Sequence, residues 1–478
     1  LPAILVRMGT ASPLEEKQAG FWASVRESVR GTQHDFTTGP LSRAILLLSV
    51  PMVLEMAMES LFAIVDVFFV AKLGAEATAT VGLTETLMTV VYGVAMGLSM
   101  ATTAMIARRV GEKRLEDAAT AAVQAVILGF AGAALIAGTG FLFARHLLGL
   151  MGAEPGVVES GWQYTAIIFA GAFAVMLLFL INAIFRGAGD AVIAMQVLWV
   201  ANGLNIILDP CLIFGLGPFP ELGLKGAAIA TTIGRSAGVI CQIWLLLGVR
   251  GRVRIRRRHL RLAGGVMWRL LRVSFSGMAQ FLIADAAWIG LVRIVAIFGS
   301  AALAGYTIAI RIILVTILPA WGMANAAATL VGQNLGAGQP DRAERSVWLT
   351  GFYNMIFLTA VGLAFFCFAE PIVRIFASDP EVVRHGVDCL RLVSSGYVFY
   401  AWGMVVVQAF NGAGDTVTPM IINIACYWIW QIPLAYFLAL PLGLGPRGSF
   451  LAIAIAESTI AVVGILVFRR GTWKTQSI

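Results

Sequence analysis

The chain has 478 residues, of which 59% are hydrophobic and only 13% are charged. A soluble domain carries about 25% charged residues, so this composition excludes a soluble enzyme, a disulfide-rich secreted fold and a disordered chain. The mean hydropathy is +0.86, and 51 residues are glycine, which is more frequent in transmembrane helices than in soluble ones. The sequence therefore predicts a polytopic membrane protein.

Twelve apolar runs are long enough to cross the roughly 30 Å hydrocarbon core of a bilayer as helices. In chain order they cover residues 44–70, 79–107, 119–143, 160–184, 191–216, 225–249, 269–297, 302–330, 346–369, 390–411, 417–441 and 449–468. We refer to them as helices 1 to 12. The predicted fold is an all-α membrane protein with twelve transmembrane helices.

The basic residues predict the orientation of these helices. If both termini lie in the cytoplasm, 24 Lys and Arg residues fall on the cytoplasmic side and seven in the opposite loops, and this is the positive-inside pattern. We therefore expect a multi-pass protein of a bacterial or archaeal inner membrane, with both termini cytoplasmic. The densest basic stretch, 250–272, joins helices 6 and 7. There we expect contact with anionic lipid headgroups rather than nucleic acid, at about 1 kcal/mol per basic residue.

The two halves of the chain repeat with a constant shift of 225 residues. Phe185–Asp190 returns as Phe410–Asp415, and Val110-Gly111 returns as Leu335-Gly336. Each half holds six helices, so the halves insert in the same orientation and are related by a pseudo-twofold axis along the membrane normal. We predict two six-helix lobes around a central cleft. The predicted segments are a cytoplasmic lead-in (1–40), an N-lobe (41–249), a basic linker (250–272) and a C-lobe (273–478).

Each copy of the repeat contains the tetrapeptide Gly-Ala-Gly-Asp, at 187–190 and 412–415. Glycine suits the left-handed residue that ends a helix, and aspartate suits the N-cap of the next one. We expect these turns to close helices 4 and 10, with Asp190 and Asp415 capping helices 5 and 11.

Ionisable residues inside a membrane are costly and are functional candidates by default. Helix 1 spaces three carboxylates at i, i+4 and i+11, which places them on one helix face that must look into a polar environment. Four more acids fall within helices 2, 5, 7 and 12. The seven acids are Glu55, Glu59, Asp66, Glu85, Asp209, Asp285 and Glu457.

Helix 5 carries a second polar stripe. Asn202, Asn205 and Asp209 stand at i, i+3 and i+7, and Pro210 follows at once. If the helix continues past the proline, the carbonyl of Ile206 loses its amide partner. Thr231 in helix 6 lies at a similar predicted depth, as does Asp66 in helix 1. Carboxylate, amide and carbonyl oxygens are suitable ligands for a small cation, so we predict that the three helices meet around one site in the N-lobe.

Three arginines within the predicted spans need partners. We expect Arg235 to neutralise an acid of helix 1, and Arg293 to pair with Asp285. The repeat places Glu85 and Arg311 at nearly matched positions across the axis, and we predict an ion pair between them that closes the outer side of the cleft.

The chain resembles the multidrug and toxic compound extrusion (MATE) family of cation-coupled efflux antiporters, most of all its DinF-like branch, from about residue 41 to 470. The motifs that carry the resemblance are Val65–Phe69 with Leu73-Gly74, Phe185–Asp190, Asn205–Pro210 and Gly226–Thr231. The resemblance implies an N-lobe cation site at Asp66, Asn205, Asp209 and Thr231. Asp285 in helix 7 does not match the register of relatives that have a C-lobe cation site, so we do not expect a second site from the resemblance.

The predicted function is multidrug efflux of amphipathic, cationic small molecules in exchange for H⁺ or Na⁺, by alternating access of the two lobes. We expect a monomer that is not an enzyme, with no cofactor and no metal beyond Na⁺ at Asp66 and Asp209. Its expected partners are small-molecule substrates and membrane lipids, without nucleic acid. Methionine and aromatic side chains are candidates for the cleft wall, namely Met56, Phe62, Met96, Trp321, Met323 and Tyr400. Residues assigned to the cleft or a gate are Glu55, Glu59, Glu85, Asn202, Arg235, Asp285 and Arg311.

The sequence leaves two alternative functions open. A lipid or lipid-linked oligosaccharide flippase would need a more basic cleft. Acids outnumber bases in the spans by seven to three when Lys225, Arg269, Arg272 and Arg391, at the span ends, are counted with the loops. An integral membrane enzyme would need a convergent catalytic cluster, and the four histidines fall in separate loops.

Overall fold

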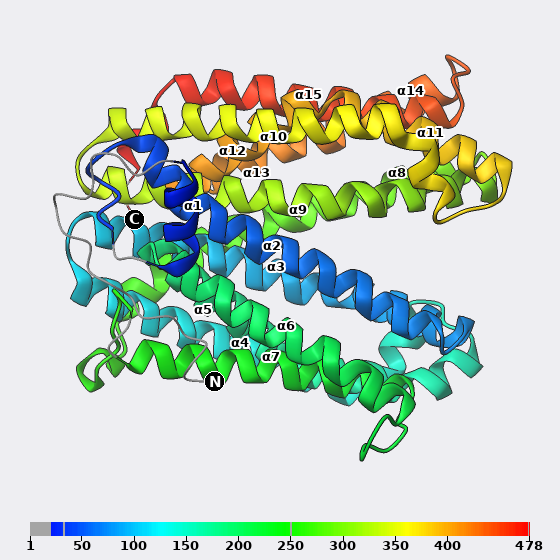
Figure 1. Cartoon of the computed structure of the whole chain (residues 1–478), viewed down its shortest axis with the longest axis horizontal. Coiled ribbons are helices and arrows are strands. Elements are labelled where there is room, and N and C mark those ends of the chain that lie inside the picture. Colours follow the sequence, from blue (N-terminus) through cyan, green and yellow to red (C-terminus); the bar gives the residue numbers. More distant parts are fainter. Residues whose placement is uncertain (1–20, 32–33, 249–250, 477) are drawn as a thin grey trace.

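The structure, a computed structural model, describes the chain except for residues 1–20, 32–33, 249–250 and 477, and the described part consists of helices and connecting loops. Figure 1 shows the elements in chain order. They are α1 (Phe21–Arg30), α2 (Leu41–Ala71), α3 (Ala75–Gly111), α4 (Leu115–Leu150), α5 (Pro155–Ala188), α6 (Ala191–Phe214), α7 (Leu224–Leu247), η2 (Arg257–Leu260), α8 (Gly264–Ala296), α9 (Ser300–Gly336), α10 (Pro340–Arg374), α11 (Pro380–Ser395), α12 (Tyr397–Ala413), α13 (Val417–Asn423), the π-helix η3 (Ile424–Gln431), α14 (Ile432–Ala439), α15 (Pro446–Arg469) and η4 (Thr472–Thr475).

These elements account for all twelve predicted runs. Ten spans in the described part of the chain are long and apolar enough to cross a bilayer, and α11 with α12, bent by 58° at Gly396, supplies one more. Helix α2, with 31 residues, covers the first predicted run and packs against α6 and α9. The prediction of an all-helical membrane fold is confirmed, although helix 10 is bent and helix 11 contains a π-helical stretch.

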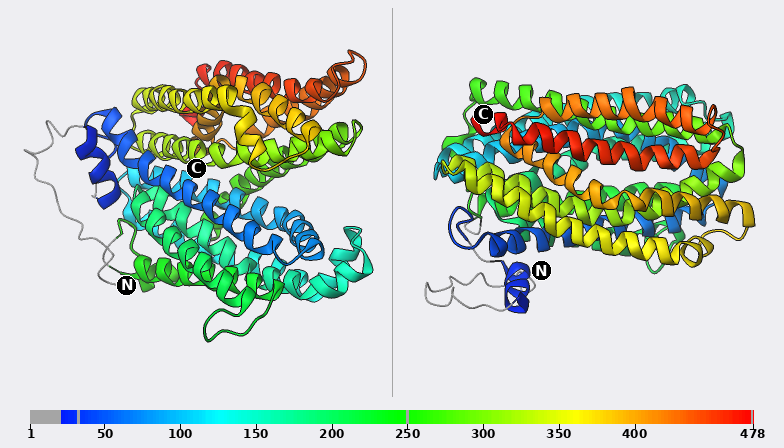
Figure 2. Two further views of the ribbon diagram at one scale, coloured as in Figure 1. Left: turned by 45° about the vertical axis from the view of Figure 1, so that its right-hand side comes forward. Right: turned by 90° about the horizontal axis from the view of Figure 1, so that it is seen from above.

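The helices form two lobes (Figures 1 and 2). Helices α2 to α7 pack mainly on one another, and α8 to α15 do the same, while the main contacts between the lobes are α2 with α9 and α3 with α8 and α9. In the left view of Figure 2, the ribbons of the two lobes diverge away from the end that holds the C-terminus. We call the lobe of α2 to α7 the N-lobe and the lobe of α8 to α15 the C-lobe.

The repeat is visible in the backbone. Gly189 ends α5 with φ +87°, and Gly414 ends α12 with φ +88°, as the turn chemistry predicts. Helix α4 is kinked at Phe143 (φ −107°, ψ 15°), and α10 is kinked 225 residues later at Phe368 (φ −111°, ψ 20°). The two halves therefore share local backbone geometry as well as helix order.

The two aspartates of the Gly-Ala-Gly-Asp turns behave differently. Thr416 rather than Asp415 is the N-cap residue of α13, but the Asp415 carboxylate still accepts hydrogen bonds from the Thr418 amide (3.1 Å) and hydroxyl (2.7 Å) in the first turn. Asp190 is the N-cap residue of α6 as predicted, but its side chain makes no capping hydrogen bond to that helix. Its Oδ2 instead accepts the Arg252 amide at 2.7 Å, since the basic linker folds back over this turn. Burial raises the pKa of Asp190 to about 6, although the hydrogen bond and charge of Arg252 oppose this.

At the end of the bundle that carries these turns, which we call the GAGD end, the lobes are closed against each other. The Thr329 hydroxyl donates to the Arg186 carbonyl (3.1 Å), and the Gln333 amide donates to the Gly187 carbonyl (3.0 Å). The repeat-related glycines, Gly111 and Gly336, each lie against backbone of the opposite lobe, where a Cβ would collide. This end is therefore sealed by close backbone packing and buried amides.

Candidate functional site

The predicted cation ligands of α6 and α7 lie together inside the N-lobe. The Asn205 side-chain amide donates to the Thr231 hydroxyl at 3.1 Å. Asp209 is completely buried, and neither of its carboxylate oxygens has a hydrogen-bond partner among the described residues. Helix α6 continues through Pro210, so the Ile206 carbonyl lacks the amide that this proline removes. Several buried oxygens with lone pairs are thus collected at one place.

Asp66 approaches this cluster from α2. Its half-buried carboxylate is close enough to Asp209 for the two charges to repel each other, and Glu85 and Arg235 also act on it electrostatically. No direct hydrogen bond joins Asp66 to Asn205, Asp209 or Thr231 in the described structure. Two neighbouring carboxylates and unpartnered buried oxygens fit a proton or a small cation, because either would relieve the repulsion and the missing hydrogen bonds.

Glu59 belongs to a separate, internally neutral group. The Arg235 guanidinium donates to its Oε1 at 2.6 Å and to its Oε2 at 3.4 Å, and Asn202 donates to Oε2 at 2.9 Å. Arg235 also lies over the ring of Phe62, 4.9 Å from its centroid. The expectation that Arg235 neutralises an acid of helix 1 is confirmed. This acid faces the interior of the N-lobe.

Glu55 belongs to a network that the sequence did not reveal. Its Oε1 accepts hydrogen bonds from the side chains of Asn182 (3.1 Å) and Arg186 (3.4 Å), and the side-chain oxygen of Asn182 accepts one from Gln242 (2.6 Å). The predicted run 160–184 leaves Arg186 in a loop, but the residue is buried in the last turn of α5. The i, i+4 pair Asn182 and Arg186 on an otherwise apolar helix was the signal that could have shown it.

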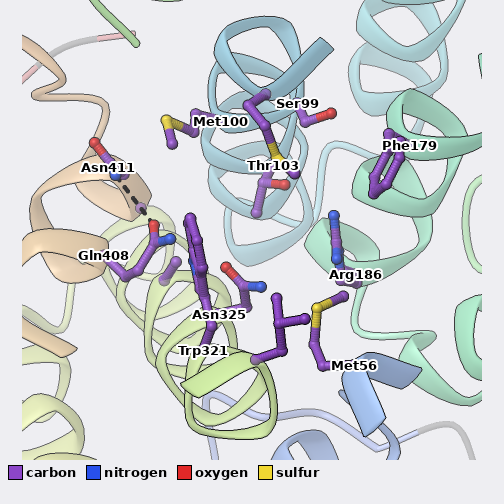
Figure 3. A pocket seen from close by; sticks show the side chains of 14 residues that line it. Met56, Ser99, Met100, Thr103, Phe179, Arg186, Trp321, Asn325, Gln408 and Asn411 are labelled. Carbon is purple, nitrogen blue, oxygen red and sulfur yellow. Dashed lines mark hydrogen bonds between the residues drawn. The ribbon is translucent and has the colours of Figure 1, made fainter. Parts of the chain in front are cut away.

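A pocket lies between the lobes, next to the sealed GAGD end (Figure 3). Arg186 lines it from α5, and its repeat counterpart, Asn411, lines it from α12, where it donates to Gln408 at 3.1 Å. Among the described residues, Arg186 is the charged side chain in the wall of this pocket. The other lining residues are Met56, Met96, Ser99, Met100, Thr103, Phe179, Leu318, Trp321, Asn325, Ala328, Gln408 and Gly412.

Three of the six predicted cleft-wall side chains, Met56, Met96 and Trp321, line this pocket. The seven polar residues assigned to the cleft or a gate do not contribute to its lining. Instead, Glu55, Glu59, Asn202 and Arg235 bond to one another or to neighbouring side chains within the N-lobe.

The remaining three gate candidates lie nearer the opposite end. Glu85 and Arg311 are exposed, and although Arg311 acts electrostatically on Glu85, they form no direct ion pair in the described structure. Asp285 lies beside Thr89 of the other lobe. The expected pair of Asp285 with Arg293 is not formed, because Arg293 is exposed on a different part of α8. This end is therefore not closed by the predicted charges in the conformation seen here.

Two helical lobes around a shared pocket, with a buried polar cluster inside one lobe, define a membrane transporter of the repeat-built type. The MatE family model matches residues 51–211 and 286–437, and the chain belongs to this family.

Similar proteins support this assignment along nearly the whole chain. A probable multidrug resistance protein NorM of Thermotoga maritima is 28% identical, over 92% of this chain and 94% of its own length. A protein of Shewanella oneidensis described as an FAD transporter is 26% identical, over 84% and 89%. A MATE crystal structure in complex with MaL6 aligns with a TM-score of 0.86 at 29% identity, covering 92% of this chain and 99% of the other.

Proposed function

We propose that this protein is a cation-coupled antiporter that exports amphipathic small molecules, as a multidrug efflux transporter. The observation that carries the coupling is the N-lobe cluster of Asp66, Asn205, Asp209 and Thr231, in which the Asp209 carboxylate is fully buried and unpartnered. Such a group binds H⁺ or Na⁺ strongly only while its surroundings keep it buried, so its occupancy depends on the conformation of the lobe.

Because cation occupancy depends on the conformation of the lobe, cation binding can be coupled to substrate transport. A cation bound to Asp66 and Asp209 favours one arrangement of the lobes, and substrate in the central pocket favours the other, because each ligand shifts the equilibrium by its difference in affinity for the two states. The sealed GAGD end and the unpaired Glu85 and Arg311 at the opposite end fit a state open to the outside. This assignment uses the orientation predicted from the basic residues, with both termini in the cytoplasm of an inner membrane.

The basic linker is proposed to rest on lipid headgroups. Its described part is tied to the N-lobe, since His259 bonds to Glu116 at 2.6 Å and the Gln124 amide donates to the Arg261 carbonyl at 3.0 Å. Arg258 is paired with Glu116, whereas the exposed Arg256 and Arg257 remain available to anionic headgroups.

The pocket favours a second candidate for the substrate class. We predicted cationic substrates, but among the described residues the charged side chain that lines the pocket is Arg186, which also donates to Glu55, and Trp321 and Phe179 line the same pocket. A guanidinium beside aromatic rings suits a planar anion, and the Shewanella oneidensis relative is described as an FAD transporter. A flavin nucleotide is therefore the second candidate.

The test uses the purified full chain in proteoliposomes, with a pH gradient and a Na⁺ gradient imposed separately. Uptake of a cationic dye and of FAD is measured under each gradient. Gradient-driven movement of either compound supports the antiporter, and the preferred compound decides the substrate class. Movement of neither compound under both gradients would contradict the proposal.

A further inference from the structure

One buried acid of the membrane spans takes no part in the N-lobe cluster. Glu457 lies in α15 of the C-lobe and is 7% exposed. Its Oε1 accepts a hydrogen bond from the Tyr427 hydroxyl at 3.1 Å, and no described basic residue forms an ion pair with it. A carboxyl group in this situation must either hold a proton or draw a cation from outside, because a buried charge without a partner is costly.

A second cavity lies beside this acid. Its wall includes Glu457, Trp288, Tyr397 and Tyr400, and the rest is mostly aliphatic. The Tyr397 side chain is 2% exposed, and its hydroxyl has no hydrogen-bond partner of ordinary geometry among the described residues. The Glu457 carboxyl group and the Tyr397 hydroxyl therefore line the same small cavity.

The local backbone is unusual at the same place. Tyr427 lies in the π-helix η3 (Ile424–Gln431), which interrupts the helical run between α13 and α14. π-Helical turns are rare and occur frequently at functional sites, because they shift side chains out of the ordinary helical register. The register shift accompanies the placement of the Tyr427 hydroxyl against Glu457.

The repeat relates this site to the N-lobe cluster. A shift of 225 residues carries Thr232 to Glu457 and Asn202 to Tyr427. Thr232 is next to Thr231, and Asn202 lies on the polar stripe of α6. The acid and its donor thus occupy the helix pair of the C-lobe that corresponds to α6 and α7, although the ligands of the N-lobe are not themselves repeated.

We propose that Glu457 is a second proton-binding site of the transporter, located in the C-lobe, with Tyr427 as its positioning residue. A metal ion would require several more oxygen ligands than the cavity wall provides. The titratable groups that face the carboxyl are Tyr400 from α12 and Cys426 and Tyr427 from η3. None of them supplies a positive charge, so a proton is the ligand that this site fits.

The role in transport rests on the proposed antiport, whereas proton binding itself does not. Binding is measured on the full chain in lipid nanodiscs, by infrared difference spectra between acidic and neutral buffer. We expect a band of a protonated carboxyl group that disappears in Glu457→Gln and shifts in Tyr427→Phe. The band should persist in Asp209→Asn and in the control Asp388→Asn, whose partly exposed carboxylate is paired with Arg447. A Glu457→Gln spectrum identical to the unsubstituted protein would overturn the proposal.

The second arm measures transport driven by a pH gradient in proteoliposomes. We expect Glu457→Gln to lose this transport and Glu457→Asp to retain part of it. If the carboxyl band is lost and transport is unchanged, Glu457 binds a proton without coupling it, and the role in the transporter is refuted. Tyr427→Phe keeps the carboxyl group, so its band shift tests the site even if Glu457→Gln does not fold.

Discussion

Replacing Arg235 with methionine should destabilise the N-lobe by leaving Glu59 without its cation. The Arg235 side chain is 4% exposed and that of Glu59 is 17% exposed, with a shortest nitrogen to oxygen distance of 2.6 Å. Breaking a buried ion pair costs about 3–5 kcal/mol, because the remaining charge stays buried. Asn202 still donates to Glu59, so we expect a loss near the lower limit, about 3 kcal/mol.

A second substitution should restore most of this loss of unfolding free energy. In Glu59→Gln with Arg235→Met, both charges are absent and the side-chain volumes are nearly kept, so the double variant should lie within about 1 kcal/mol of the unsubstituted protein. The free energy of unfolding is measured in detergent by denaturant titration. Arg447→Met is the control, because it breaks the exposed pair with Asp388 and should cost at most about 1 kcal/mol. Equal losses for Arg235→Met and the double variant would refute the proposed origin of the cost.

Two further predictions concern the GAGD end. Burial places the Asp190 pKa at about 6, above its ordinary value of 3.8, so the stability that this group contributes is present below about pH 4 and lost as the pH rises to about 6. Asp190→Asn keeps the acceptor for the Arg252 amide and should raise the unfolding free energy at neutral pH by up to about 3 kcal/mol. Unfolding titrations at acidic and neutral pH check this. A pH dependence of the unfolding free energy equal to that of the unsubstituted protein would argue against it. Gly336→Ala places a Cβ against the Arg108 carbonyl and should open this end, so a cysteine at the buried position Thr329 should react faster with a maleimide. Gly82→Ala, where a Cβ meets open space, is the control, and equal labelling rates in both variants would contradict the seal.

Helical periodicity was sufficient to group the N-lobe cluster. Asn205, Asp209 and Thr231 are brought together because i, i+3 and i+4 spacings put polar groups on one face, and a membrane forces such faces inward. The same spacing predicted that a basic residue would pair with an acid of α2, and Arg235 pairs with Glu59. These features depend on local spacing and on the cost of exposing charge to lipid, and both can be read from a sequence.

Other contacts depend on the path of the chain in space. Asp190 meets Arg252 only because the linker returns over the α5–α6 turn, which no local pattern indicates. Arg186 was misassigned because α5 extends to Ala188, beyond the apolar run that marked its end. The π-helix at Tyr427 was also missed, since its residues are as apolar as those of an ordinary transmembrane helix.

The central claim is that Asp66 and Asp209 couple cation movement to export. Its most direct test is efflux of a fluorescent substrate from everted membrane vesicles, driven separately by a pH gradient and by a Na⁺ gradient. Asp66→Asn and Asp209→Asn should each abolish gradient-driven efflux, while Asp388→Asn, which alters a partly exposed carboxylate paired with Arg447, should retain it. Unchanged efflux in Asp66→Asn and Asp209→Asn under both gradients would contradict the mechanism.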